Sequence, residues 1–185
     1  MSTYIQNFKK FQPLLNELIM RDIKTKYRKS ILGVFWTILN PLFMMVVLSV
    51  VFSNMFKFDV EYFPVYLLSG QLIFNFFNEA TTNAMGAIVA NGPLIKKIYV
   101  PKYMFVLSRI FSSSINLLAS FTAMIFVMLA MRVELHYTVL LAPIPLIFIV
   151  FFSLGVGLIL SAITVKFRDI MHLYSVFVTA LMYLT

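Results

Sequence analysis

The sequence of 185 residues contains no cysteine and few charged side chains. Without cysteine it offers no disulfide, no thiol nucleophile, no iron–sulfur cluster and no cysteine-bound zinc. Charged residues make up 12% of the chain and hydrophobic residues 61%, whereas soluble domains carry about 25% charge. This leaves too little polar surface to cover a soluble globule, and it also excludes a disordered chain. The composition therefore indicates an integral membrane protein.

Motifs for independent catalysis are also missing. The sequence has no phosphate-binding loop of the form G-x-x-x-x-G-K-[ST], so it offers no site for ATP. Its two histidines, His136 and His172, lie far apart, and no pair of acidic residues falls inside one apolar run. We therefore expect no catalytic residue, no metal site and no cofactor bound by this chain. Energy for any active transport would have to come from another protein.

Long uncharged runs predict membrane-spanning helices. Such runs, one of them interrupted only by Glu79, cover residues 31–56, 62–95, 110–131 and 137–165. A helix of about 20 apolar residues crosses the hydrocarbon core. We predict an all-α membrane protein with a cytoplasmic N-terminus, residues 1–30, and a transmembrane domain, residues 31–185. Its spans are expected at about residues 33–56, 63–89, 105–131, 138–163 and, as a short segment interpreted as truncated, 171–185.

The basic residues are distributed unevenly between the two expected sides of the membrane. Of the 15 lysines and arginines, 13 fall before the first span, between the second and third, or after the fourth. By the positive-inside rule these segments, including the N-terminus, are cytoplasmic. The net charge of +8 thus marks membrane orientation and contact with anionic membrane lipids, and no nucleic-acid partner is expected.

Residues 8–29 have the pattern of an amphipathic helix that is too polar to span a membrane. An apolar side chain recurs every fourth position at Leu15, Ile19, Ile23 and Tyr27, and the stripe is widened by Phe11, Leu14 and Leu18. Pro13 suits the first turn. The pattern predicts an N-terminal interfacial helix that anchors and orients the chain. Alternatively, the polar side of this helix contacts a cytoplasmic subunit.

The cytoplasmic loop of residues 91–103 is expected to contain a short amphipathic helix at about residues 92–101. Pro93 can begin this helix and Pro101 can end it. Its apolar face is expected to consist of Leu94, Ile95 and Ile98. The other face would contact water or a partner and consists of Lys96, Lys97 and Tyr99. A simpler interpretation is a turn whose lysines bind lipid headgroups.

The second expected span carries a row of polar side chains. The row consists of Gln71, Asn75, Asn78, Glu79 and Asn83, and it also includes Thr82. Their spacing predicts one helical face, and because lipid cannot satisfy such groups the face should meet protein or a wet cavity. This polar face has three possible roles, namely helix packing or subunit contact, the lining of a conduit, and proton chemistry. Arg109 is the expected partner of Glu79.

Aromatic residues make up 16% of the chain. Each single ring is explained by packing or lipid contact. Together they can line a path for sugar rings, whose C–H faces pack on aromatic side chains. The residues we select for such a substrate path lie in the first expected span and are Phe35, Trp36, Phe43, Phe52 and Phe56.

One stretch of the sequence is similar to a known family. Residues 21–33 read Arg-Asp-Ile-Lys-Thr-Lys-Tyr-Arg-Lys-Ser-Ile-Leu-Gly, and Trp36 and Asn40-Pro41 follow. This order resembles the opening signature of the permease subunits of type-2 ABC exporters that carry O-antigen, capsule or teichoic-acid polysaccharides. Members of that family normally have six spans, so a sixth is expected in the full chain beyond the five visible here.

The resemblance implies two functional groups of residues. The first is a basic cluster on the interfacial helix, formed by Arg21, Asp22, Lys24, Lys26, Tyr27 and Arg28. The second is a coupling helix that docks into a cytoplasmic ATPase through Pro93, Leu94, Ile95, Lys96, Lys97, Ile98, Tyr99 and Pro101.

The resemblance also implies an assembly and a substrate. Two permease copies and two ATPase subunits, which bind ATP and Mg²⁺, would export a lipid-linked polysaccharide across the bacterial cytoplasmic membrane. Two alternatives stay open at this stage. One is an exporter of the same superfamily for a small molecule, drug or lipid, and the other is a non-transporting scaffold for envelope assembly.

Overall fold

The computed structural model describes residues 2–27, 35–36, 38–40, 42–44, 46–47, 62–133 and 137–184. Over these residues the chain is helical and contains no strand, which confirms the predicted all-α fold. Its first half contains α1 (Ser2–Tyr27), α3 (Phe63–Ala90), α4 (Gly92–Lys97) and α5 (Tyr103–Ala130). A 3₁₀ turn, η2 (Tyr137–Leu141), then precedes α6 (Pro143–Lys166) and α7 (Ile170–Leu184).

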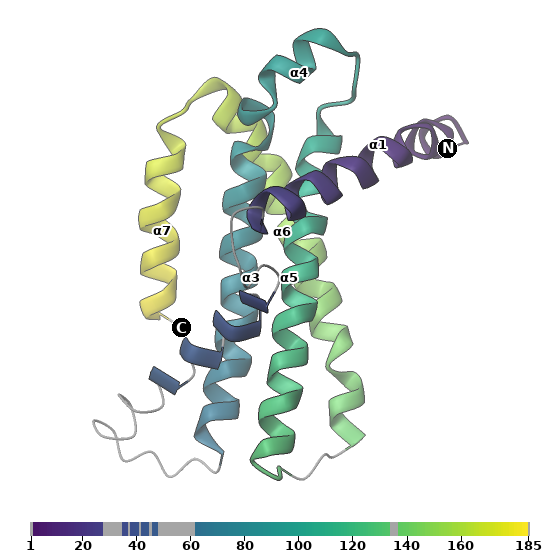
Figure 1. Cartoon of the computed structure of the whole chain (residues 1–185). Helices are drawn as coiled ribbons and strands as arrows, with labels where there is room; N and C mark the ends of the chain where they lie inside the picture. Colours follow the sequence, from purple (N-terminus) through teal and green to yellow (C-terminus); the bar gives the residue numbers. More distant parts are fainter. Residues whose placement is uncertain are drawn as a thin grey trace.

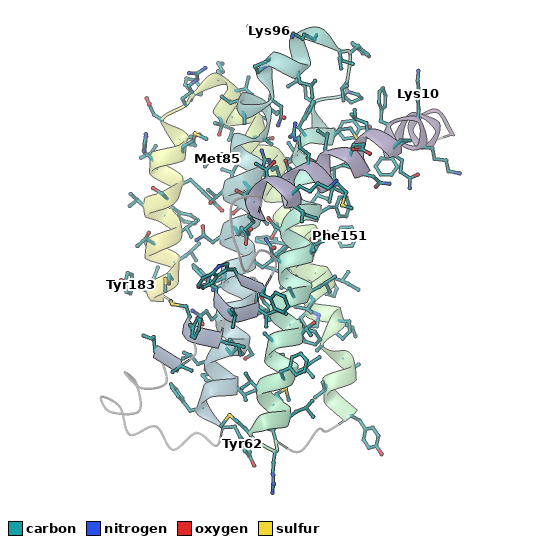
Figure 2. All side chains as sticks on the ribbon, in the orientation of Figure 1. Lys10, Tyr62, Met85, Lys96, Phe151 and Tyr183 are labelled. Carbon is teal, nitrogen blue, oxygen red and sulfur yellow. The ribbon has the colours of Figure 1, made fainter. Side chains whose placement is uncertain are left out.

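The long helices α3, α5 and α6 form an upright bundle in which α3 is central (Figure 1). Helix α7 flanks this bundle, α1 crosses it at a steep angle, and α4 lies at one end. We call this end the α4 end; Figure 2 shows Lys96 there and Tyr62 at the opposite end. The arrangement brings α1 against α5, although α3 and α4 lie between them in the sequence.

Proline and left-handed residues set the limits of several helices. Pro93 and Pro143 stand in the first turns of α4 and α6, where a backbone N–H has no partner within the helix. Tyr62, with φ 55°, precedes α3, and Arg132, with φ 53°, follows the end of α5. Both residues lie at the end of the bundle opposite α4 (Figure 2). Helix α1 begins at Ser2, so Pro13 lies in its interior and not in the predicted first turn.

Helices α3 and α6 approach closely because both present small side chains. The buried residues of α6 are Ser153, Gly157, Ser161 and Thr164. Opposite them on α3, Ala80 and Ala84 are fully buried. A Cβ atom added to Gly157 would lie 2.8 Å from the Cβ atom of Ala84, closer than packed carbon atoms allow. Such small-residue contacts are common between membrane helices, and this one fixes the spacing of α3 and α6.

The core at the α4 end anchors α1 to the bundle. Phe105, Val106 and Ile110 of α5 are fully buried and pack with Leu15 and Leu18 of α1. The buried side of α1 continues to Asp22, which is 7% exposed. Phe11, Leu14 and Ile19 pack against the same core, so much of the predicted apolar stripe of α1 faces the bundle, together with one acidic residue.

A buried polar contact links α7 to α3. The hydroxyl of Tyr174 donates a hydrogen bond of 2.7 Å to Oγ1 of Thr81, which itself bonds to the backbone oxygen of Phe77. Val178 and Met85 pack beside this contact. Thr81 is fully buried, so its hydroxyl needs partners inside the protein.

Tyr174→Phe should lower the stability of the detergent-solubilised protein by about 1 kcal/mol, because it removes one neutral hydrogen bond and keeps the ring. A melting curve followed by size-exclusion chromatography measures this loss. Tyr183→Phe is the matched control, since Tyr183 is 84% exposed on the same helix. Equal melting temperatures for both variants would show that the Thr81 contact does not hold α7.

Two of the described helices are long and apolar enough to cross a membrane: residues 103–129 within α5 and the whole of α6. Helix α3 is longer than α6, but its polar row lowers its apolar character, and α7 is a shorter apolar helix. The expected spans 63–89, 105–131 and 138–163 coincide closely with α3, α5 and α6. Most of the expected span 33–56 lies outside the described residues. The spans themselves stay predictions.

Candidate functional site

A polar cleft lies between α1, α3 and α5. It consists of two adjoining cavities of about 690 and 380 Å³, which share Lys26, Glu79 and Ser113. The larger cavity lies toward the α4 end, where Asn91 contributes to its wall. The smaller one extends along α3 and α5 and is bordered by Trp36. We refer to the two together as the polar cleft.

Glu79 lies where the two cavities meet and has two partners. Lys26 Nζ of α1 lies 2.8 Å from Glu79 Oε1, and Asn116 Nδ2 of α5 donates a 2.7 Å hydrogen bond to the same oxygen. The expected pairing of Glu79 with Arg109 is wrong, because Arg109 contacts Asp22 instead. One carboxylate thus joins three helices, and its negative charge is offset by a lysine from the helix that precedes α3.

A second charged group lies at the α4 end of the cleft. The carboxylate of Asp22 is 5% exposed and is approached by Arg21 at 3.2 Å and by Arg109 Nε at 3.4 Å. A buried carboxylate is costly unless opposite charges accompany it. The two arginines supply these charges, so Asp22 can occupy the apolar side of α1.

Arg109→Leu should destabilise the protein by about 3 kcal/mol, because it removes one of the two cations from a buried carboxylate. The melting temperature in detergent measures the effect. The double variant Asp22→Leu/Arg109→Leu should recover most of the loss, since an apolar pair replaces the ion pair. A double variant no more stable than Arg109→Leu would contradict this account of the cluster.

Asn91 connects the same cluster to α4. Its backbone oxygen accepts hydrogen bonds from Leu94 and Ile95 in the first turn of α4. Its side-chain nitrogen donates to the backbone oxygen of Ala87 at the end of α3, and its Oδ1 accepts a 3.0 Å bond from Arg21. Asn91 is 6% exposed. The junction of α3 and α4 is thereby bonded to α1.

The predicted polar row divides between two sides of α3. Four members at intervals of four residues line the polar cleft: Gln71, Asn75, Glu79 and Asn83. Asn83 Nδ2 also bonds to Ser113 Oγ at 3.5 Å. Asn78 lies beside this row and accepts a hydrogen bond from Thr82. The polar face is therefore narrower than the sequence indicated, and it points toward α5.

The residues of the predicted basic cluster of α1 lie in different environments. Arg21, Asp22 and Lys26 line the polar cleft, whereas Lys24 is exposed. The backbone of Tyr27 ends α1, and Arg28 lies outside the described residues. Only part of the cluster is therefore placed against the bundle.

Of the five aromatic residues selected for a substrate path, Trp36 borders the polar cleft, together with Asn40 and Met44. Phe35 and Phe43 are exposed and do not line it. Phe52 and Phe56 lie outside the described residues. Within the described ranges, no three His, Asp or Glu side chains are arranged to hold a metal ion.

The proposed coupling segment projects from the α4 end (Figure 1). Helix α4 ends at Lys97, earlier than predicted, because Ile98 is extended with φ −133° and ψ 135°. Leu94 and Ile95 pack toward the core. Ile98 does not join this apolar face as expected but is 52% exposed, beside Tyr99 at 94%. Exposed side chains also include Pro93, Lys96 and Lys97, and Pro101 is half-buried.

Several residues that line the polar cleft were not identified from the sequence. Asn91 was assigned only to a loop, and Asn116, Ser112 and Ser113 were treated as parts of an uncharged run. The sequence did indicate that these residues need partners, because amides and hydroxyls inside an apolar run require hydrogen bonds. The choice of partner, however, depends on how α5 is rotated against α3.

Comparison with known proteins places the chain in a family. Residues 13–185 match the family described as ABC-2 type transporter. The chain is 28% identical over 171 residues to the O-antigen export system permease protein RfbA of Myxococcus xanthus, covering 92% of this chain and 66% of that protein. A protein of the same name from Klebsiella pneumoniae is 27% identical over 176 residues, with 93% and 67% covered.

A capsule exporter is similar over a shorter stretch. The capsule polysaccharide export inner-membrane protein BexB of Haemophilus influenzae is 27% identical over 160 residues, covering 83% of this chain and 59% of that protein. The chain thus spans about two thirds or less of the length of these relatives. Because the family match extends over residues 13–185, most of the chain, the chain belongs to the ABC-2 type transporter membrane family.

Proposed function

We propose that this chain is the transmembrane subunit of an ATP-driven exporter of a lipid-linked polysaccharide. The observation that carries the proposal is the family match over residues 13–185, together with relatives named for O-antigen and capsule export. The cargo would be an O-antigen, capsule or teichoic-acid type polymer that crosses the bacterial cytoplasmic membrane. The names of these relatives favour a polysaccharide over a small molecule, drug or lipid, and transport over a scaffold role.

The energy source in this proposal is a separate ATPase subunit, present in two copies. The sequence has no phosphate-binding loop, so ATP and Mg²⁺ would bind to the partner. The α4 end supports a docking role because Ile98 and Tyr99 are apolar or aromatic and exposed, beside two exposed lysines. Such side chains are typical anchors of protein interfaces.

The proposed topology is multi-pass with a cytoplasmic N-terminus. It is supported by the basic residues of the α4 end, among them Lys96, Lys97 and Lys102, which the positive-inside rule assigns to the cytoplasm. Two permease copies would enclose the polymer path, since one bundle of this size offers little room for a glycan. The basic residues near α1 would attract the anionic headgroup of the lipid carrier.

The test is to purify the full-length protein from its native locus and identify its partner. A stoichiometric soluble subunit that hydrolyses ATP, and ATP-dependent movement of lipid-linked polysaccharide in vesicles, are expected. A chain that purifies alone at every salt concentration would support the scaffold alternative. Movement of small molecules or lipids but not of the glycan would support the other alternative.

A further inference from the structure

The short helix α4 is connected to the distant helix α1 through one buried side chain. Asn91 is the single residue between the end of α3 at Ala90 and the start of α4 at Gly92. Its Oδ1 accepts a 3.0 Å hydrogen bond from Nη2 of Arg21, which lies 70 positions earlier in the sequence. Asn91 is 6% exposed, so little water competes for this bond. The bond therefore holds α1 to the junction of α3 and α4.

The other hydrogen bonds of Asn91 fix its side chain and the start of α4. Asn91 Nδ2 donates to the backbone oxygen of Ala87 over 2.8 Å, and this bond turns the amide oxygen toward Arg21. The backbone oxygen of Asn91 accepts the N–H groups of Leu94 and Ile95, each at 3.0 Å. One residue thus bonds to α1, α3 and α4, so a displacement of α4 acts directly on it.

Apolar packing supports the same connection. Leu94 and Ile95 of α4 pack against the core cluster that contains Leu15 and Leu18 of α1. Helix α4 has no fully buried residue of its own, so this shared cluster is its main apolar contact with the bundle. Because α4 and α1 meet in one core, they are expected to move together.

Near its end, α1 contacts the bundle in a different way. Lys26 forms the 2.8 Å ion pair with Glu79 of α3, and Asn116 of α5 bonds to the same carboxylate oxygen. The side chains of Lys26 and Glu79 are 47% and 35% exposed, and ion pairs with such exposure contribute little stability. Helix α1 therefore combines a packed part beside α4 with a part that is held by a contact able to rearrange.

We propose that Asn91 is a positioning residue of the transport cycle, which makes α1 and α4 move as one unit. This inference rests on the proposed function, in which the ATPase docks at the α4 end. A displacement of α4 passes through Asn91 and Arg21 to α1, and α1 then changes the contact between Lys26 and Glu79. Energetic coupling over a distance needs such a chain of bonded groups, together with an element that has two arrangements.

Two substitutions of Asn91 separate its bond to Arg21 from its bond to Ala87. Asn91→Ala removes both side-chain bonds, whereas Asn91→Asp removes the donor to Ala87 and keeps an oxygen for Arg21. The assay uses the purified full-length permease with its ATPase, in vesicles that contain the lipid-linked polysaccharide of the producing strain. Asn91→Ala should lower glycan export per ATP hydrolysed about tenfold, which corresponds to the loss of one charge-assisted hydrogen bond. Asn91→Asp should export like the unmodified protein, and both variants should retain the ATPase subunit.

A substitution on α1 removes the same bond from its other end. Arg21→Met leaves the bonds of Asn91 to α3 and α4 intact and leaves Arg109 beside Asp22, so it tests the connection even if Asn91→Ala does not fold. It should lower export per ATP by a similar factor. The double variant Arg21→Met/Asn91→Ala should be no worse than either single variant, because all three lack one shared bond. Lys24→Met is the matched control, since Lys24 is exposed on α1 and lines neither cavity.

Spin labels can measure whether α1 and α4 move together. The 185 residues contain no cysteine, so labels can be placed on cysteines introduced at exposed positions. One pair joins α1 to α4 at Met20 and Lys96, and a second pair joins α1 to α6 at Met20 and Val165. With labelled permease diluted in unlabelled permease, ATP binding should change the second distance and leave the first unchanged. In Arg21→Met the second distance should no longer respond to ATP.

Three outcomes would overturn the proposal while leaving the proposed function in place. The first is normal export per ATP in both Asn91→Ala and Arg21→Met. The second is an equal loss in Asn91→Ala and Asn91→Asp, which would assign the effect to the bond with Ala87. The third is a distance between α1 and α4 that changes on ATP binding as much as the distance between α1 and α6. An unmodified protein that neither retains an ATPase nor exports glycan would instead reject the proposed function itself.

Discussion

Gly157→Ala is expected to destabilise the bundle by about 2 kcal/mol, because it forces two closely packed helices apart. The added Cβ atom would lie 2.8 Å from Ala84 Cβ and 3.3 Å from Ile110 Cδ1, so α3 and α6 would have to move apart. Both Ala84 and Ile110 are fully buried, which leaves no free space for such a shift. The measurement is the melting temperature of the detergent-solubilised protein.

The same helix provides a matched control for this substitution. Gly155 lies two residues away, and a Cβ atom added there would meet no atom within 4 Å. Gly155→Ala should keep or raise the melting temperature, because alanine favours a helix over glycine by up to about 1 kcal/mol. A similar loss in both variants would attribute the effect to α6 in general and not to its contact with Ala84.

Tyr99→Asp is expected to reduce the association of the ATPase subunit at least tenfold and to abolish ATP-dependent export, if the α4 end is the coupling surface. Tyr99 is 94% exposed, so its replacement removes no core contact, whereas a charge there opposes burial in a partner. Co-purification of the ATPase and glycan export in vesicles measure the two effects. The permease should keep its melting temperature.

A second tyrosine separates this effect from a general effect of added charge. Tyr137 is 97% exposed and follows α5 at the end opposite α4, so Tyr137→Asp makes the same chemical change away from the proposed partner. Normal ATPase association is expected for Tyr137→Asp. If Tyr99→Asp also retained the ATPase and exported normally, the coupling role of this segment would be wrong.

The sequence predicted which residues form helices better than it predicted how the helices meet. Uncharged runs indicated helices that the structure places at α3, α5 and α6, because long apolar segments have few other stable forms. The four-residue spacing of Gln71, Asn75 and Glu79 also predicted a shared face, which lines the cleft. The partner of Glu79 was missed because Lys26 and Asn116 lie 53 and 37 positions away, and spacing along one helix does not identify them.

The orientation of α1 and the end of α4 depended on tertiary contacts. Asp22 was expected in a polar cluster, but two arginines allow it to be buried beside the apolar stripe of α1. Ile98 was expected on the apolar face of a longer helix. Helix α4 instead ends at Lys97, and the extended backbone at Ile98 lets Val100 reach the core.

The order of synthesis decides when Glu79 can form its ion pair with Lys26. Glu79 is the acidic residue within α3, and Lys26 belongs to a helix that leaves the ribosome earlier. If α3 spans the membrane as predicted, the cation that neutralises Glu79 is already made when this helix inserts, whereas Asn116 arrives only with α5. In this way α1 would assist the insertion of a helix that is synthesised later. A chain that started after α1 would deliver an unpaired carboxylate to the lipid.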